Sequence, residues 1–228
     1  MAEQLRRAIV AGDLAPGQVL PTERELTVEF GVSRTTVREA LRALQAQGLL
    51  RSGGSAPFRS VVSGVSSLLG GAYEQLLSGD QITLLDLVQF RGMLEIAAIE
   101  RAVLDRTAHQ LTDVRAAATR VGVVATEELF AAYLDFHMAL VRSSGNQALL
   151  LTMEAVQGAM REHLSDAVRD VMASPHRGWT AARLSEVYTG IVEALEARDS
   201  ERAGELLLAH MTDFYNELLS AQVNATHE

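Results

Sequence analysis

Residues 31–50, GVSRTTVREALRALQAQGLL, combine an apolar stripe at helical spacing with a cluster of hydrogen-bond donors. If the stripe from Val37 to Leu44 faces a core, four polar side chains face outward near the start of the helix: Arg34, Thr35, Thr36 and Arg38. An arginine can grip guanine O6 and N7 with two hydrogen bonds, and threonine offers a hydroxyl to phosphate and a methyl group to thymine. Because an α-helix fits the major groove of B-DNA, this pattern indicates a helix that reads DNA.

The preceding residues predict a second helix at the distance that a helix-turn-helix needs. Thr22 and Glu25 have the spacing of a capping box, and the helix that they open would close at Gly31. Ser33 can cap the next helix, which continues to about Gln47. A turn of about three residues then separates the two helices.

Two further features complete a winged helix. Helical periodicity predicts a first helix over 3–11, and LLRS (49–52) and FRSVV (58–62) predict two short strands around GGSAP. We therefore expect three helices and a small β-hairpin, the wing, in a DNA-binding domain of residues 1–62.

Charge is divided unevenly along the chain. The 228 residues carry a formal net charge of −9, yet residues 1–62 hold eight Arg against six Asp or Glu, a net +2. The remaining residues hold twelve Arg against twenty-three acidic residues, a net −11. A weakly basic head on an acidic body suits a protein whose head meets phosphate, although solvated surface arginines would give the same count.

Composition excludes several kinds of chemistry. The chain contains no cysteine and no lysine, which removes disulfides, thiolate metal sites, cysteine nucleophiles, Schiff bases and a Walker lysine. No apolar run approaches the roughly 18–20 residues of a membrane span, and the first residues lack the pattern of a signal peptide. We expect a cytoplasmic protein with no membrane partner.

Beyond residue 66, apolar residues recur at helical spacing and the sequence shows no strand alternation. The helical segments are 64–78, 82–105, 109–121, 126–143, 147–171, 179–198 and 200–221. The expected fold is mainly α: a winged helix-turn-helix followed by an all-α antiparallel bundle of six to seven helices.

Residues 5–50 resemble the N-terminal domain of GntR-type winged-helix transcription regulators. The motifs are a glycine-acid-apolar-Pro-Gly loop, then LP-x-E-R-E-L and GVSR-x-x-VREAL. The resemblance implies that the arginines touch operator bases or phosphates, that the two threonines contact the DNA backbone, and that a wing-tip glycine approaches the minor groove. The implied DNA-binding residues are Arg24, Ser33, Arg34, Thr35, Thr36, Arg38, Gly53 and Gly54.

The body resembles the second domain of the all-helical FadR branch of that family, which binds effectors and forms dimers. Three stretches carry this resemblance: DLVQFRGMLEIAAIERA (86–102), FHMALVRSSGNQALL (136–150) and GIVEALEARDSERAGELLLAHM (190–211). We expect this domain at 67–221, after a linker at 63–66 and before a tail at 222–228.

Many members of that branch hold a divalent metal with an Asp, a His four residues later and two His from the last two helices. His137 and His210 fall on matching positions, but Tyr133 and Tyr188 stand where the Asp and another His are expected. Asp135 lies about 200° around the helix from His137 and is no substitute. Because two imidazoles make a poor site, we expect no cofactor; a metal at His137 and His210 is the less favoured alternative.

Two other roles stay open for these residues. The histidines could bond the two tyrosine hydroxyls in a polar core, or the same donors could bind an anionic effector directly. Arg91 lies on an inward stripe and needs either Glu95 one turn on or a ligand carboxylate. The candidate effector residues are Arg91, Tyr133, His137, Arg161, Tyr188 and His210, and the ligand would be an organic acid or acyl compound.

We therefore expect a regulator with no catalytic residues. It would be a homodimer that binds palindromic operator DNA and represses until a small anionic metabolite binds the body. Two alternatives remain: an effector-independent architectural DNA binder and, less favoured, an enzyme that uses the Tyr/His cluster.

Overall fold

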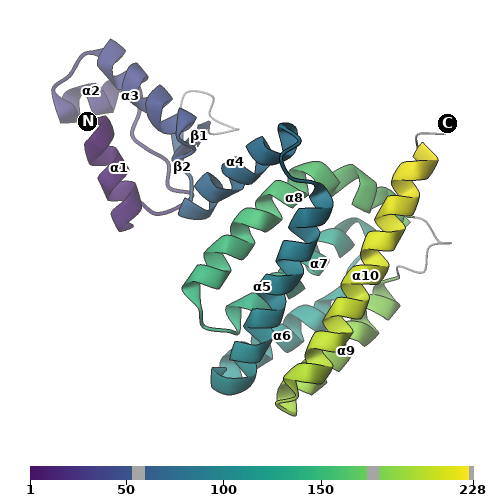
Figure 1. The fold of residues 1–228 in the computed structure, drawn as a ribbon. Coiled ribbons are helices and arrows are strands. Elements are labelled where there is room, and N and C mark those ends of the chain that lie inside the picture. The colour runs from purple at the N-terminus through teal and green to yellow at the C-terminus, as the bar shows by residue number, and fades with distance from the viewer. Residues whose placement is uncertain (53–59, 174–179, 226–228) are drawn as a thin grey trace. The chain divides into compact units, whose positions relative to one another are not determined.

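The computed structural model describes residues 1–52, 60–173 and 180–225, and contains ten helices and two strands within those ranges (Figure 1). Contacts divide the chain into two compact units, Met1–Gln75 and Leu76–Glu228, which we call the head and the body.

The head is a winged helix-turn-helix followed by most of a fourth helix. Its elements are α1 (Ala2–Ala11), α2 (Glu23–Phe30), α3 (Arg34–Ala46), β1 (Leu50–Ser52), β2 (Ser60–Val62) and α4 (Val65–Ser78). The two strands pair antiparallel with Arg51 opposite Val61, and Val19 forms a bridge to Val61 from the loop after α1.

Local sequence fixes the turn between α2 and α3. Thr22 and Glu25 form the predicted capping box, and α2 ends where Gly31 adopts the left-handed conformation with φ 63°. Ser33 then caps α3 by accepting a hydrogen bond of 3.1 Å from the Thr36 amide.

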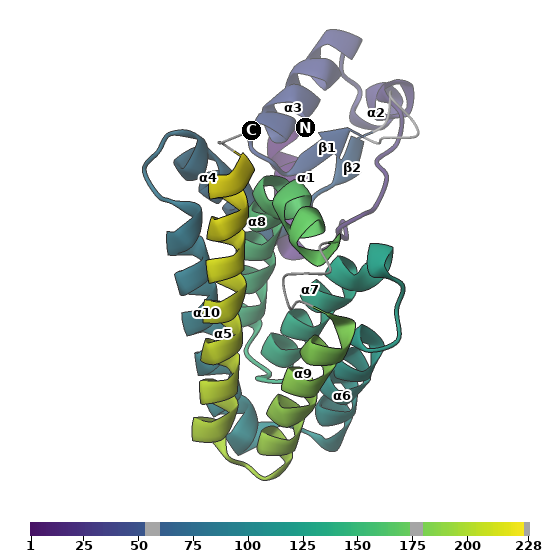
Figure 2. The same ribbon diagram turned by 90° about the vertical axis from the view of Figure 1, so that its right-hand side faces the viewer.

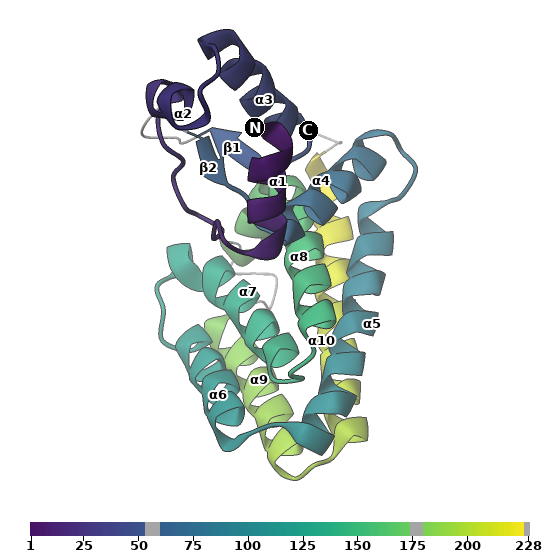
Figure 3. The ribbon, with the colours of Figure 1, turned by 90° about the vertical axis from the view of Figure 1, so that its left-hand side faces the viewer.

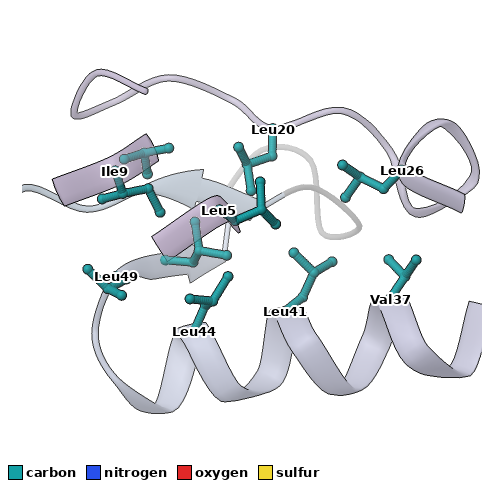
Figure 4. Packing of buried hydrophobic residues seen from close by; sticks show 10 residues of the cluster. Leu5, Ile9, Leu20, Leu26, Val37, Leu41, Leu44 and Leu49 are labelled. Atoms are coloured by element: carbon teal, nitrogen blue, oxygen red, sulfur yellow. The ribbon is translucent and has the colours of Figure 1, made fainter. Parts of the chain in front are cut away.

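An apolar core sets the orientation of α3 in the head (Figure 4). In Figure 4, Val37, Leu41 and Leu44 point from α3 toward side chains of α1 and α2. The buried cluster consists of Leu5, Ile9, Leu20, Leu26, Val37, Leu41, Leu44, Leu49, Leu50 and Val62. Because the apolar side of α3 is committed to this core, its polar side faces outward.

The body is an antiparallel helical bundle. The helices that follow α4 form this bundle: α5 (Leu84–Asp105), α6 (Ala108–Val121), α7 (Thr126–Arg142), α8 (Gln147–Ala173), α9 (Ala181–Glu196) and α10 (Ser200–Ala225). Figures 2 and 3 show α5 beside α10, and α6 packed with α7 and α9.

Helix α5 contacts four other helices of the body, α7, α8, α9 and α10. At Gly92 an added β-carbon would lie 3.3 Å from Met211 Sδ, so the absence of a side chain lets α5 and α10 approach closely. Two of the buried residues of α5, Arg91 and Glu95, are charged. These charges need partners from the surrounding helices.

The mainly α fold predicted from the sequence is confirmed. Within the described residues, seven helices follow the hairpin, as the periodicity predicts. The segment expected as a linker, 63–66, runs into α4, which starts at Val65, and the head unit extends to Gln75. Likewise α10 continues through the first part of the segment expected as a tail.

Among the described residues, no helix combines the length and the apolar character that a membrane span requires.

Candidate DNA-binding surface and buried polar core

The outward side of α3 carries the donors that the sequence predicts. Arg34, Thr35, Thr36 and Arg38 are all exposed. The Thr36 hydroxyl lies 2.9 Å from the Ser33 hydroxyl, which also caps the helix. Ser33 therefore has a structural role, whether or not it also contacts DNA.

Helix α2 contributes an acidic residue to the same part of the head. Arg38 Nε donates to Glu23 Oε2 at 2.8 Å, and 59% of the Arg38 side chain and 36% of the Glu23 side chain remain exposed. Arg24, the next residue of α2, is also exposed. Gly53 and Gly54, the expected wing-tip contacts, lie outside the described residues.

A chain of hydrogen bonds crosses the interior of the body. Arg91 Nε donates to Glu95 Oε1 at 2.7 Å, and Glu95 Oε2 lies 2.8 Å from His137 Nδ1. The Arg91 side chain is 2% exposed, and those of Glu95 and His137 are 0% exposed. Glu95 thus pairs with Arg91 one turn away and joins α5 to α7.

Tyr188 of α9 extends this chain to α10. Its hydroxyl lies 3.2 Å from His137 Nε2 and 3.2 Å from His210 Nε2. One set of protons fits every link: His210 Nε2–H donates to the Tyr188 oxygen, Tyr188 O–H donates to His137 Nε2, and His137 Nδ1–H donates to the Glu95 carboxylate. Both histidines are neutral in this arrangement.

Aromatic rings enclose the hydrogen-bonded residues. The Tyr133 ring lies 4.6 Å from the His137 ring, centroid to centroid, and 5.1 Å from Arg91 Cζ. Phe136 stacks on Tyr188 with ring centroids 3.7 Å apart. Tyr188 therefore bridges both histidines, while Tyr133 packs over the arginine and one imidazole.

Burial and neighbouring charges set the protonation of this cluster. Burial, and then the charge of Arg91, lowers the pKa of His137 from 6.5 to about 4. Burial also lowers the pKa of His210 well below its ordinary value. Burial alone would raise the pKa of Glu95, but His137 and Arg91 outweigh it, so that pKa is lowered and the carboxylate stays charged.

The donor set does not fit the divalent metal that the FadR branch often holds. Both histidine Nε2 atoms point at the Tyr188 hydroxyl, at the place where a shared metal would have to lie. A neutral phenol is a poor ligand, and Asp135 lies elsewhere, paired with Arg120 at 2.8 Å. Among the described residues, no group of three or more His, Cys, Asp or Glu could hold a metal ion.

A small cavity lies on the Arg91 side of this cluster, bordered by α5, α7 and α8. Tyr133, Gln157 and Arg161 also line it, and its volume of about 10 Å³ gives room for about one water molecule. Arg91 Nη2 is buried without a hydrogen-bond partner among the described residues. The six expected effector residues thus separate into Arg91, Tyr133 and Arg161 at the cavity, and His137, Tyr188 and His210 in the hydrogen-bond chain.

Sequence reasoning missed one contact and one residue of this region. Glu95 was expected as a partner of Arg91, but its bond to His137 was not foreseen. Its place on a buried stripe with Arg91 and Ala98 was a usable signal, because a buried carboxylate needs more than one donor. Gln157 is 6% exposed and donates to the Leu134 carbonyl at 3.0 Å, and nothing in its local sequence marked it.

Two family models match the chain. "Bacterial regulatory proteins, gntR family" matches residues 1–58, and "FCD domain" matches residues 86–213, which is more than half of the chain. The chain belongs to the GntR family. It is a DNA-binding transcription regulator of the kind that carries an FCD domain, and not an enzyme.

Relatives of nearly full length are regulators as well. The chain is 28% identical over 213 residues to the HTH-type transcriptional regulator LutR of Bacillus subtilis, covering 89% of this chain and 92% of LutR. It is 27% identical over 224 residues to the HTH-type transcriptional repressor NanR of Cronobacter sakazakii, covering 93% and 82%. The Glc operon transcriptional activator of Escherichia coli is 25% identical over 210 residues, covering 86% and 80%.

Solved structures share the fold. Streptococcus agalactiae GntR superposes with a TM-score of 0.60 at 19% identity, covering 93% of this chain and 96% of that one. A GntR-family regulator from Pseudomonas syringae gives a TM-score of 0.51 at 23% identity, covering 99% and 86%.

The buried histidines of this GntR-family regulator predict that its body loses stability in mild acid. Because the folded-state pKa of His137 is about 4 and its ordinary value is 6.5, the unfolded chain binds more protons between those values, and stability falls as the pH drops through that window. Urea unfolding followed by circular dichroism should give an unfolding free energy about 1–2 kcal/mol lower at pH 5 than at pH 7.

The His137→Gln variant should show a smaller loss between the same pH values. His109→Gln is the control, because 86% of the His109 side chain is exposed. Equal pH dependence in the parent and in His137→Gln would contradict the assignment of the effect to the buried imidazole.

Proposed function

We propose that this GntR-family regulator is a dimeric, cytoplasmic repressor that recognises its operator through α3 and releases it when a small organic acid binds the body. The observation that supports recognition is the set of exposed donors at the N-terminal end of α3. That end of the helix also carries the positive end of its dipole, which attracts phosphate. Arginine and threonine there can combine base reading with backbone contacts.

Replacement of Arg34 by alanine tests this assignment. The side chain is exposed, so the fold should survive, while operator affinity should fall by roughly 1–3 kcal/mol of binding free energy. The measurement is fluorescence anisotropy with an operator duplex selected by the parent protein, at several salt concentrations. Affinity should fall with salt for the parent, and a shallower salt slope for Arg34→Ala would indicate a phosphate contact rather than a base contact.

Arg7→Ala is the matched control, because it removes one exposed arginine from another helix of the head. If Arg34→Ala and Arg7→Ala bind the operator as tightly as the parent, α3 is not the reading element.

An apolar groove of about 720 Å³ between α5 and α10 supports the proposal of a dimer. Met93 and Leu208, which line it, are 66% and 51% exposed. Exposed apolar surface of this kind marks interaction sites, and a twofold contact between copies would supply two heads for the two halves of a palindrome.

Charged residues in the groove should separate the copies. We expect Met93→Asp combined with Leu208→Asp to give a monomer in light scattering and to weaken operator binding, because the apolar contact is lost. Leu104→Asp is the control, since Leu104 of α5 is 68% exposed but does not line the groove. If the doubly substituted chain stays dimeric, the dimer interface lies on another part of the surface.

Arg91 and Arg161 support an acidic effector. The buried Nη2 group of Arg91 has no hydrogen-bond partner among the described residues, and both arginines line the cavity with Tyr133. A carboxylate could accept charge-assisted hydrogen bonds from both arginines. Because the cavity has room for about one water molecule, such a ligand would have to widen it, and that change of packing is the step that would alter operator affinity.

Arg161→Ala tests the acid site without disturbing the buried ion pair. Acetate, L-lactate and succinate are titrated into the parent bound to operator, and the concentration that releases DNA is measured. Loss of one charge-assisted hydrogen bond should raise that concentration by roughly tenfold or more in Arg161→Ala.

Arg101→Ala is the control, because Arg101 is exposed and paired with Asp105. If the same concentration of acid releases DNA from Arg161→Ala as from the parent, the effector binds elsewhere. Failure of every acid to release DNA would favour the effector-independent architectural binder.

A further inference from the structure

The ion pair between Glu23 and Arg38 joins the two helices of the helix-turn-helix. Glu23 is the first residue of α2 and Arg38 lies in the second turn of α3, fifteen positions later in the chain. The bond of 2.8 Å engages Arg38 Nε, and both side chains stay partly open to solvent. A carboxylate is thus placed beside an arginine that is expected to meet DNA.

The fold does not require this ion pair. An exposed pair of this kind adds little to stability, because solvent screens the two charges and both side chains lose conformational freedom. The contact between α2 and α3 is already secured by Leu26 and Val37, which are 1% and 0% exposed. Meanwhile a negative charge near the DNA surface opposes the approach of phosphates. The position of Glu23 therefore calls for a functional reason.

Arginine has five N–H donors, and the bond to Glu23 uses one of them. The terminal Nη groups can still donate to a guanine edge or to a phosphate, and they do so from a side chain whose position is already restricted. Pre-ordering a long, flexible side chain removes part of the entropy cost of binding.

We propose that Glu23 is a positioning residue for specificity: it presents Arg38 to the operator and its charge weakens binding to unrelated DNA. This inference rests on the proposed role of α3 in operator binding. The net effect of Glu23 on affinity has opposite signs on the two kinds of DNA. On the operator, the gain from a positioned Arg38 exceeds the repulsion. On unrelated DNA, where Arg38 finds no matching base edge, the repulsion remains.

The test compares Glu23→Ala with Glu29→Ala in the full-length chain. Glu29 is exposed on the same helix, and no ion pair involving it is found among the described residues, so both variants lose one negative charge from α2. Affinities are measured by fluorescence anisotropy at one salt concentration, for the selected operator and for an unrelated duplex of equal length.

Glu23→Ala should weaken operator binding by about threefold to tenfold and strengthen binding to the unrelated duplex slightly, because a charge that repels phosphate is lost. Glu29→Ala should leave both affinities unchanged or slightly stronger. The proposal is overturned if Glu23→Ala behaves like Glu29→Ala, or if it weakens binding to both duplexes equally.

A double-mutant cycle separates this inference from the proposed function. If Glu23 acts through Arg38, its removal no longer weakens operator binding in an Arg38→Ala background and strengthens it slightly, because only the repulsion is lost. If Arg38→Ala alone binds the operator like the parent, the role of Arg38 in DNA binding fails, and this inference fails with it. If Arg38→Ala weakens binding but Glu23→Ala does not, the inference fails alone.

Melting temperatures check that the variants fold. Glu23 is in the first turn of α2, where a negative charge interacts favourably with the helix dipole. If Glu23→Ala melts markedly lower, Glu23→Gln replaces it, since glutamine keeps an acceptor for Arg38 without the charge. Under the proposal Glu23→Gln retains part of the operator affinity and binds unrelated DNA slightly more tightly; if it does neither, the proposal is overturned.

Discussion

The burial of Arg91 and Glu95 on α5 is the constraint on which the rest of the body depends. A buried ion pair is stable only if its remaining donors and acceptors are satisfied, because the desolvation cost amounts to several kcal/mol per charge. Glu95 meets this demand by holding both Arg91 and His137, and the chain continues through Tyr188 to His210. Since these residues lie on α5, α7, α9 and α10, one set of hydrogen bonds specifies how four helices align.

This arrangement explains why the body departs from the metal-binding pattern of its branch. Tyr188 supplies a neutral bridging oxygen where another imidazole is expected, and it needs no cation to neutralise the site because Arg91 already balances Glu95. On the side away from the histidines, Arg91 lines a small cavity, and its Nη2 group has no hydrogen-bond partner among the described residues. An acid that bound beside Arg91 would therefore act through the ion pair that aligns the helices.

Sequence periodicity was sufficient to predict the fold class and the buried face of most helices. The inward position of Arg91, His137 and His210 could be predicted because each lies on an apolar stripe. The pairing between helices could not, since a stripe shows which side is buried but not which residue lies opposite. Hence the sequence predicts Glu95 as a partner of Arg91 and His137 as a separate inward residue, and nothing in it marks Gln157. The bond from Glu23 to Arg38 escaped for the same reason, because both residues lie on polar faces and their partners depend on how α2 and α3 pack.

The modest charge of the head has a consequence for how it can select DNA. Residues 1–62 carry a net charge of only +2, so general attraction to phosphate is weak and most of the difference between DNA sequences must come from a few well-placed donors. Glu23 places an acidic residue among these donors. It lowers the affinity for unrelated DNA, which is already weak, and it restricts the position of a neighbouring arginine. Specificity, which is the ratio of the two affinities, then gains from both effects.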